Sequence, residues 1–382
     1  MRILHIITTV SRLGGAENHL LSLIREQSAR GHDIDLVWLK GDGEIAGRYR
    51  GAGCRTAVKV PFERPAHAFS AIASLRRRMA EHRYHIVHTH LIKSDVLGGI
   101  AARLTRPRPA VVTTKHCDEP VFRILPVGIA HGFLTHIAYD HVISISDRVR
   151  AFFERRGYVP KSRSSRVYYG FDRSLYPPSD PQDIRTQFAL PDESFLFGIV
   201  GRLTEQKNHL FLLPVFAELA RAYPEARLMI IGGEGYSPDY RIQVENLIDS
   251  LGIGDRTIMT GWREDAYALM GELDCMVLPS AWEGLGVVFI EAISQGVPVI
   301  ATRTSAVPEV VRDGIDGILV EPGAASELRD AMSAMIEQRD IIQPRTRREG
   351  PAYIDNKFSV GNMVEETLAV YREALARRGI DA

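Results

Sequence analysis

At 382 residues the chain exceeds the size of one ordinary hydrophobic core, which favours two domains. It is 45% hydrophobic and 25% charged, a globular balance that argues against a disordered chain, and no apolar run reaches the roughly 18 residues of a membrane span. The formal net charge is zero, yet residues 1–172 hold 27 Lys and Arg against 15 Asp and Glu, and residues 173–382 hold 20 against 32. The basic first half suggests an anionic partner, such as a membrane surface, a phosphorylated acceptor or nucleic acid; the alternative is that charge merely drifted between two lobes.

The chain opens on residues 1–8, which are too few for a signal peptide and predict a buried strand. Three cysteines, Cys54, Cys117 and Cys275, are scattered and fit no metal-binding spacing. Reduced thiols and a cytoplasmic location are therefore expected.

A glycine-rich turn at Gly14 and Gly15 follows the first strand, and residues 17–29 have helical spacing. Strand, glycine turn and helix together are typical of a phosphate-binding crossover. The turn lacks the G-x-G-x-x-G spacing of dinucleotide sites, which argues against a nicotinamide oxidoreductase, and a plain tight turn is the alternative.

The next strand, residues 34–39, begins beside a D-x-D sequence at Asp33 and Asp35. Some sugar transferases hold a metal and a diphosphate with such a pair. Here the pair precedes and enters a strand instead of following one, so we interpret it as the polar edge of that strand.

Alternating strands and helices continue through the first half, with strands near residues 55–58, 85–88 and 110–113 and a helix near 67–82. Its Arg76–Arg78 run fits a solvated face. His90 and His116 follow two of the strands, and ligands of open parallel sheets bind beyond the carboxyl ends of strands. His90 is thus a candidate site residue, although a lone histidine is more often packed or at the surface.

Residues 121–138 are mostly apolar but interrupted by Pro126, Gly128 and Gly132, which predicts a buried or interfacial helix. The turn-rich residues 170–179 mark a linker, and domain boundaries follow at 1–172, 173–359 and 360–382.

The second half repeats the alternation, with strands at 195–200, 228–231, 257–260 and 317–320. Arg202 and Lys207 stand between the end of one strand and the start of a helix, where two cations suit a diphosphate. Helices are expected at 324–339 and 360–377, separated by a polar stretch at 344–350.

The sequence between the strands at 273–278 and 297–301 places two carboxylates eight residues apart, Glu283 in a loop and Glu291 one turn inside a helix. Gly286 and Val287 lie near the start of that helix, where unpaired amides and the helix dipole favour an anion. Amides for phosphate and carboxylates for hydroxyls suit a nucleotide sugar. The alternative is a helix with an incidental surface glutamate.

Together these residues resemble the family-4 retaining glycosyltransferases, over nearly the whole chain. The resemblance rests on Gly201-Arg202-Leu203 with Lys207-Asn208, on the Glu283 to Glu291 unit, and on residues 296–299. Tyr169 stands before Gly170, where the family usually has Asn. The resemblance implies the α/β fold called GT-B, two Rossmann-like lobes with parallel sheets facing across a cleft and a C-terminal helix returning to the first lobe.

The resemblance also implies roles for individual residues. Arg202 and Lys207 would bind the donor diphosphate, Glu291 the ribose hydroxyls and Glu283 the donor sugar. Amides of Leu285, Gly286, Val287 and Val288 would line sugar and phosphate, and Trp262 and Arg263 would meet the base. Gly15 would approach phosphate or acceptor from the first lobe, and His90 would sit at the reacting centre.

The expected activity is transfer of a sugar, a hexose by preference, from a nucleotide-diphosphate donor to an acceptor hydroxyl with retention, in surface glycan or polysaccharide biosynthesis. No metal and no cofactor are expected. The expected partners are the nucleotide sugar, a glycan or lipid-linked acceptor and the anionic inner face of the cell membrane, not nucleic acid. The alternatives are a nucleotide-sugar epimerase of the same fold and a non-catalytic sugar-nucleotide-binding protein.

Overall fold

The structure, a computed structural model, describes residues 1–10, 14–118, 124–176, 184–235 and 237–381. The start of the glycine turn, the start of the 121–138 segment and part of the 170–179 linker lie outside the described residues. The chain divides into two compact units. Unit 1 comprises Met1–Asp172 with Phe358–Ala382, and unit 2 comprises Arg173–Lys357.

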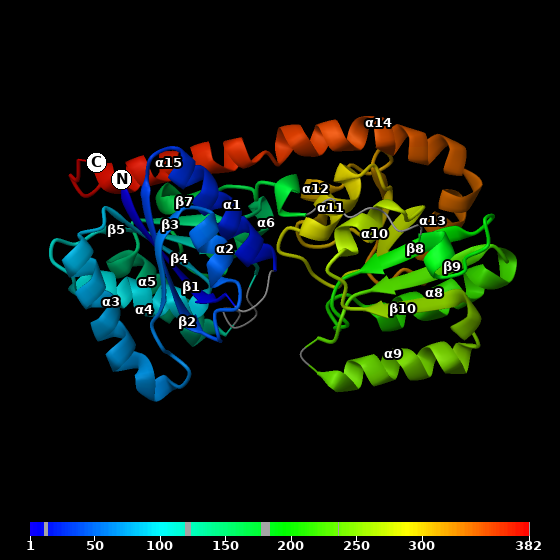
Figure 1. The fold of residues 1–382 in the computed structure, drawn as a ribbon, viewed down its shortest axis with the longest axis horizontal. Coiled ribbons are helices and arrows are strands. Elements are labelled where there is room, and N and C mark those ends of the chain that lie inside the picture. Colours follow the sequence, from blue (N-terminus) through cyan, green and yellow to red (C-terminus); the bar gives the residue numbers. More distant parts are fainter. Residues whose placement is uncertain (11–13, 119–123, 177–183, 236, 382) are drawn as a thin grey trace. The chain divides into compact units, whose positions relative to one another are not determined.

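Unit 1 is built on a seven-stranded sheet in the order β3-β2-β1-β4-β5-β6-β7, with all neighbours parallel (Figure 1). Its strands are β1 Arg2–Thr9, β2 Asp33–Lys40, β3 Cys54–Lys59, β4 Ile86–His90, β5 Ala110–Lys115, β6 His141–Ser144 and β7 Ser164–Arg166. Its α-helices are α1 Gly15–Ala29, α2 Ala46–Gly51, α3 Ala68–His82, α4 Ile92–Leu104, α5 Leu125–Ala138, α6 Asp147–Arg156 and α15 Val360–Ala376. Most residues of β1, β2 and β5 are buried, as expected where helices cover both faces of a parallel sheet.

Unit 2 repeats this plan with a six-stranded parallel sheet in the order β10-β9-β8-β11-β12-β13. Its strands are β8 Phe195–Val200, β9 Ala226–Ile231, β10 Thr257–Gly261, β11 Cys275–Leu278, β12 Val299–Thr302 and β13 Gly317–Val320. Its α-helices are α7 Ile184–Gln187, α8 His209–Ala222, α9 Pro238–Leu251, α10 Ala266–Gly271, α11 Val287–Ser294, α12 Val307–Val310, α13 Ala325–Glu337 and α14 Arg339–Lys357. In each sheet the strand order reverses beside the first strand, at β1/β4 and at β8/β11, and open parallel sheets bind ligands at such switch points.

One sequence-based expectation is wrong: the polar stretch at 344–350 is not a break but the middle of α14, which contains Pro344 and Pro351. Tertiary packing overrides the low helix propensity of proline here. Gly350 lies against Ile293 of α11, where a Cβ would come within 2.7 Å of the Ile293 carbonyl oxygen. Gln343 donates through Nε2 to the carbonyl oxygen of Asp274 at 3.0 Å, so α14 is also bonded to the residue that precedes β11.

Helix α15 belongs to unit 1, where it packs against α1 and β5. Its Tyr371 is fully buried, and Arg378 just beyond the helix donates to Asp140 at 2.8 Å. The C-terminal segment therefore completes the core of the unit that the N-terminus begins.

Candidate active site

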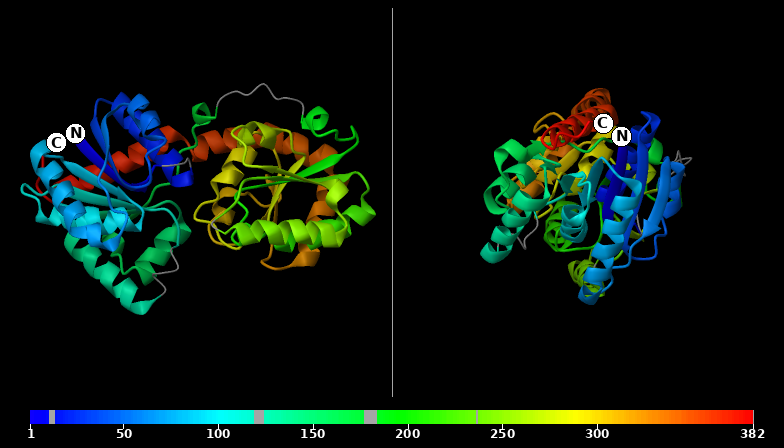
Figure 2. Two further views of the ribbon diagram at one scale, coloured as in Figure 1. Left: turned by 60° about the horizontal axis from the view of Figure 1, so that its bottom comes forward. Right: turned by 90° about the vertical axis from the view of Figure 1, so that its left-hand side faces the viewer.

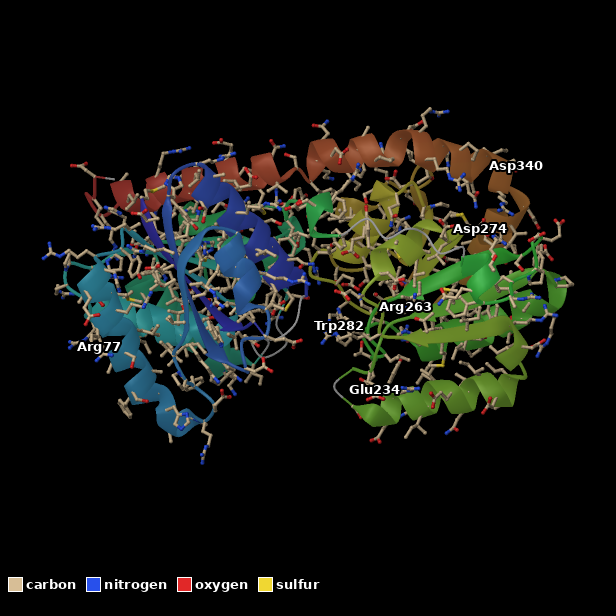
Figure 3. All side chains as sticks on the ribbon, viewed as in Figure 1. Arg77, Glu234, Arg263, Asp274, Trp282 and Asp340 are labelled. Carbon is tan, nitrogen blue, oxygen red and sulfur yellow. The ribbon has the colours of Figure 1, made fainter. Side chains whose placement is uncertain are left out.

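The predicted site residues divide between the two units. In unit 2 they lie on the loops after β8, β10 and β11 and in the first part of α11, at the carboxyl end of the sheet. Figure 3 labels Trp282, Arg263 and Glu234, which come from three of the loops at this end. Side chains from separate segments of sequence are therefore collected at one edge.

Backbone hydrogen bonds join the loops after β8, β9 and β10 in a row. Leu203 N–H donates to the carbonyl of Gly233 at 3.0 Å, and Gly232 N–H donates to that of Gly261 at 3.0 Å. Gly232 has a φ of 157°, and a Cβ there would lie 1.9 Å from the carbonyl oxygen of Gly201. Only glycine permits this approach, so Gly232 is structural and fixes the position of the loop that carries Arg202.

Lys207 and Glu283, which sequence analysis placed on different parts of the donor, form an ion pair. Lys207 Nζ donates to Glu283 Oε1 at 2.6 Å, and Ser280 Oγ donates to the same oxygen at 2.7 Å. Both side chains are mostly buried, with 15% of Lys207 and 8% of Glu283 exposed. The ammonium carries three donors, so it can retain this bond and still meet an anion.

The loops before α8 and α11 are tied to each other on either side of this pair. Gln206 Nε2 donates to the carbonyl of Trp282 at 2.9 Å, and Asn208 Nδ2 donates to that of Pro279 at 3.2 Å. The backbone N–H of Ala281 donates to Gln206 at 2.8 Å. The distance between Lys207 and the amino end of α11 is thereby preset by backbone and amide contacts.

Helix α11 begins as the sequence predicted. Gly286 caps its amino end with a φ of 83°, the left-handed region that favours glycine. Val287 and Val288 supply first-turn amides, which no residue of the helix itself can accept from, and these amides with the helix dipole favour an anion. Leu285 is 2% exposed and anchors the loop in the core.

Glu291 lies one turn inside α11, as expected, and Tyr176 donates to its Oε1 at 2.5 Å. Although part of the residue is accessible, burial of the carboxyl raises its pKa to about 7, against the opposing effects of Tyr176 and Lys207. Tyr176 in turn packs on Tyr267, with ring centroids 4.3 Å apart. A carboxylate held in this way is an acceptor for hydroxyl groups whose binding would favour its ionised form.

The remaining predicted residues of unit 2 are accessible. Arg202 is exposed on the loop after β8, and Trp262 is 73% exposed beside Gly233. Arg263 donates through Nε and Nη2 to the two carboxylate oxygens of Asp265, each at 2.7 Å. Trp262 thus offers an open ring face for stacking, whereas Arg263 is oriented by a bidentate pair.

In unit 1, Gly15 is the exposed first residue of α1, and His90 ends β4. His90 is fully buried, and both ring nitrogens face other histidines: Nε2 lies 3.2 Å from His5 Nδ1, and Nδ1 lies 3.4 Å from His116 Nε2. The structure therefore places the side chain of His90 inside a network of rings. Half-buried His116 is its more accessible neighbour.

This histidine network is a continuous chain of hydrogen bonds across the sheet, from Tyr169 through His116, His90, His5, Gln27, Tyr371 and His88 to Thr114. The orientation of one amide sets every tautomer. With Gln27 Oε1 accepting from His5 Nε2 at 2.9 Å, His5 Nδ1 must accept from His90, and each next ring follows in turn. On the other side, Gln27 Nε2 donates to Tyr371, which donates to His88 at 2.6 Å.

All the imidazoles of the network are neutral in this arrangement. Burial lowers the pKa of His5 to about 4, although its bond to Gln27 opposes the shift, and burial with the nearby charge of Lys115 lowers the pKa of His116 to about 3. The pKa values of His88 and His90 are lowered well below their usual range, first by burial. His5, His88 and His90 are also the cluster of described residues that could hold a metal, with nitrogens within 4.8 Å of one another. Since every one of these nitrogens already has a hydrogen-bond partner, the rings fit a neutral network better than a metal.

Within the D-x-D sequence, Asp35 has a structural role, but it lies inside β2 and is not the polar edge that the sequence predicted. Asp35 is fully buried and accepts from Arg55 Nη2 at 2.6 Å and from Thr56 Oγ1 at 2.8 Å, and Tyr84 donates to it as well. Although burial opposes ionisation, these bonds lower the pKa of Asp35 to about 2. The carboxylate is an internal anchor between β2 and β3.

Several residues that contact the predicted ones could not be recognised from the sequence. Ser280, Tyr176 and Tyr267 carry no motif, and their roles depend on packing between loops. The histidine network did leave a signal: His88 and His90 are two residues apart, so a strand points both to one face.

With this geometry established, comparison with known proteins identifies the family. Residues 13–175 match the family model described as Glycosyltransferase Family 4, and residues 180–350 match the one described as Glycosyl transferases group 1. The chain belongs to the family-4 glycosyltransferases. It is a glycosyltransferase enzyme, as the resemblance implied.

Curated relatives are similar over most of this glycosyltransferase. It is 27% identical over 323 residues to a UDP-Gal:alpha-D-GlcNAc-diphosphoundecaprenol alpha-1,3-galactosyltransferase of Escherichia coli, covering 81% of this chain and 80% of that protein. It is 26% identical over 393 residues to a D-inositol 3-phosphate glycosyltransferase of Mycolicibacterium smegmatis, covering 95% and 87%.

Solved structures confirm the GT-B fold of this glycosyltransferase. HepE of Anabaena in complex with UDP and glucose superposes with a TM-score of 0.84 at 22% identity, covering 97% of this chain and 98% of that one. A sucrose-phosphate synthase from Thermosynechococcus elongatus gives a TM-score of 0.81 at 20% identity, covering 99% and 100%.

Among the described residues, the structure contains no helix of the length and apolar character that crossing a membrane requires.

Proposed function

We propose that this glycosyltransferase moves a hexose from a nucleoside diphosphate sugar to an acceptor hydroxyl, with retention of configuration and without a metal ion, in glycan or polysaccharide biosynthesis. The observation that carries the proposal is the cluster formed by Lys207, Ser280, Glu283 and Glu291 at the amino end of α11. It combines a cation and first-turn amides for a diphosphate with two carboxylates for hydroxyl groups.

In the proposed complex, Lys207 and Arg202 bind the donor diphosphate together with the amides of Val287 and Val288. Glu291 accepts hydrogen bonds from the ribose, and Glu283 contacts the transferred sugar while remaining paired with Lys207. Trp262 stacks on the base, and Arg263, held by Asp265, borders it. Gly15 at the amino end of α1 leaves room for phosphate or acceptor in unit 1.

The proposed reaction breaks the bond between the anomeric carbon and the diphosphate oxygen, while the acceptor hydroxyl forms a new bond to the same carbon. The sugar passes through an oxocarbenium-like state, and the diphosphate leaves as an anion. Lys207 and Arg202 then interact more strongly with the leaving group than with the intact donor, which lowers the barrier. The acceptor proton passes to a diphosphate oxygen, so no protein base is required.

Retention and metal independence have separate support. Glu283, the carboxylate assigned to the sugar, is bound by Lys207 and Ser280 through one oxygen, an arrangement suited to orienting hydroxyls rather than to attacking carbon. The two cations take the part that a divalent ion plays elsewhere. The D-x-D carboxylate Asp35 is committed to Arg55, Thr56 and Tyr84.

The names of similar proteins guide the choice of substrates. The relative from Escherichia coli is named for transfer from UDP-galactose to a diphosphoundecaprenol-linked sugar, and HepE was solved with UDP-glucose. We therefore propose a uridine diphosphate hexose as donor and a lipid-linked glycan as acceptor. The excess of basic residues in 1–172 suits an acceptor presented at the anionic inner face of the membrane.

The test is incubation of the enzyme with UDP-glucose, UDP-galactose and UDP-N-acetylhexosamines, with and without a polyprenyl-diphosphate sugar, in excess EDTA. NMR of the product should show an α-linkage from an α-donor, and turnover should survive the chelator. Loss of activity in EDTA that manganese restores would refute metal independence. If the donor were epimerised in the absence of acceptor, the function would be epimerisation of the nucleotide sugar and not transfer of its sugar.

A further inference from the structure

Helix α5 of unit 1 exposes large apolar side chains, whereas an ordinary surface helix turns its apolar side chains toward the core. Three of its outward side chains, each four residues from the next, are large and apolar. Ile129 is 54% exposed, Phe133 66% and Ile137 40%, and Ile124, just before the helix, is 55% exposed. The stripe follows one side of one helix, unlike apolar residues scattered singly over a surface.

The inward side of α5 carries small and polar residues instead. Gly132 lies against Tyr158, and a Cβ on Gly132 would come within 2.7 Å of the Tyr158 Cβ. His131 Nδ1 donates to the carbonyl of Gly157 at 3.0 Å, and buried Thr135 donates to the carbonyl of His131 at 2.9 Å. The outward apolar stripe is therefore not the result of a loosely placed helix: the inward face is already fitted to unit 1, and the helix cannot turn over to bury Phe133.

Basic side chains lie at the carboxyl end of the helix and near the segment that packs beside its middle. Arg108 Nη2 donates to the carbonyls of Ile137 and Ala138, each at 2.9 Å, and exposed Arg103 and Arg106 precede it. On the other side, Tyr158 is 43% exposed and follows exposed Arg155 and Arg156. Residues 103–163 contain 11 Lys and Arg against 5 Asp and Glu, while residues 124–138 contain none of the four.

An uncharged apolar stripe within a cationic border matches the cross-section of an anionic bilayer surface, where apolar side chains enter the acyl boundary and Lys and Arg remain among the headgroups. Tyr158 has the apolar ring and polar end that suit the boundary between them. Figure 2 shows the teal and green helices of this part of the chain on the outside of unit 1.

We infer that α5 is a membrane-docking face, which inserts Ile129, Phe133 and Ile137 into an anionic lipid bilayer while the arginines around it contact lipid headgroups. The inference rests on the proposed function in taking the acceptor to be lipid-linked, but membrane binding itself involves no turnover. Burying each of these side chains contributes of the order of 1.5–3 kcal/mol, and each basic residue near the surface about 1 kcal/mol. The apolar stripe thus contributes affinity for any bilayer, and the border contributes the preference for anionic lipid.

The experiment is co-sedimentation of the full-length enzyme with vesicles of phosphatidylcholine alone or mixed with phosphatidylglycerol, at low and high salt. The variant is Ile129→Ser/Phe133→Ser/Ile137→Ser, and the matched control is Phe69→Ser, which removes an 88% exposed phenylalanine from α3 of the same unit. Wild-type and Phe69→Ser proteins should bind the anionic vesicles equally, and the triple variant should bind at least about 100-fold more weakly. Arg155→Glu/Arg156→Glu should lose part of the binding to anionic vesicles and nothing on neutral ones.

Unchanged binding by a folded triple variant, or an equal loss in Phe69→Ser, would overturn the inference. Binding that is absent for the wild type, with concentration-dependent dimers that the triple variant abolishes, would overturn it in favour of an interface between copies. Turnover of a short-chain, water-soluble acceptor should be the same for all four proteins. If the wild-type protein did not turn over this acceptor, the result would count against the proposed function, and the result on membrane docking would still stand.

Discussion

The two units use polar residues in opposite ways. The histidine network of unit 1 consists of neutral side chains that satisfy one another in the core, from His5 to Tyr371. The cluster around Lys207 and Glu283 in unit 2 consists of charges placed on loops at the ends of strands. Desolvation accounts for the neutral network, because a buried imidazole can discard its charge. Of these two clusters, the one around Lys207 is therefore the better candidate for binding an anionic ligand.

The largest expected effect is a loss of folding stability in unit 1 at acidic pH. The pKa values of folded His5 and His116 lie below the usual 6.5, so these residues stabilise unit 1 above pH 6.5 relative to lower pH, and this contribution is lost as the pH falls towards about 4 and 3. At pH 5 each such histidine costs about 2 kcal/mol of stability. In unit 2, burial lowers the pKa of His209 to about 4, so this residue destabilises the unit as the pH falls through the same range. The pKa of Glu291 is raised to about 7, so this residue stabilises the unit as the pH falls and offsets the effect of His209.

Unit 1 should therefore weaken sharply between pH 7.5 and pH 5, and unit 2 should change little. Hydrogen exchange, corrected for its intrinsic pH dependence, measures both at once on peptides from β4 and β5 and from β8 and β9. A parallel loss of protection in the two units would mean that the network is not neutral as the hydrogen bonds require.

The next test removes the charge that unit 2 retains. Lys207→Ala should lower kcat by roughly 10²–10³-fold, because the cation faces a leaving group that gains charge as the bond breaks. The matched control is Arg221→Ala, an exposed cation at the other end of α8, which should have normal kinetics. Steady-state kinetics in both donor and acceptor measure the effect.

Removing Lys207 also leaves mostly buried Glu283 without its counter-charge, which itself destabilises the loop. Lys207→Ala/Glu283→Gln relieves that cost and should restore the folded state without restoring turnover. If a folded Lys207→Ala enzyme kept normal kcat and KM, the diphosphate assignment would be withdrawn.

The smallest expected effect separates binding from stability at Glu291. Since the pKa of the folded carboxyl, about 7, lies above the usual 4.5, the residue costs stability as the pH rises through this range. Glu291→Gln should stabilise unit 2 at pH 8 by about 1–3 kcal/mol, less where solvent reaches the group, and leave it unchanged below pH 4.5. The same variant should raise the KM for donor more than it lowers kcat, because the ribose is held equally in ground and transition states.

Thermal unfolding of Glu291→Gln at pH 8 and pH 4.5, beside exposed Glu193→Gln as control, gives the first quantity, and donor kinetics give the second. A variant that loses stability at pH 8 would show that Glu291 is a structural partner of Tyr176 rather than a residue kept for a ligand.

The sequence by itself determined the alternation of strands and helices, the glycine positions, the placement of Glu283 in a loop and Glu291 one turn inside α11, and the family. These are local properties, set by hydrophobic period, by the φ that only glycine adopts at Gly286, and by spacing along one segment. Packing of α14 on α11 made a helix of a stretch that holds Pro344 and Pro351, contrary to its propensity. Tertiary structure also decided the pairing of Lys207 with Glu283, 76 residues apart, and the joining of His88 to Tyr371, 283 residues apart. Contacts across such separations, and the burial that sets the charge of each histidine, depend on which elements pack together, and no local pattern in the chain encodes that.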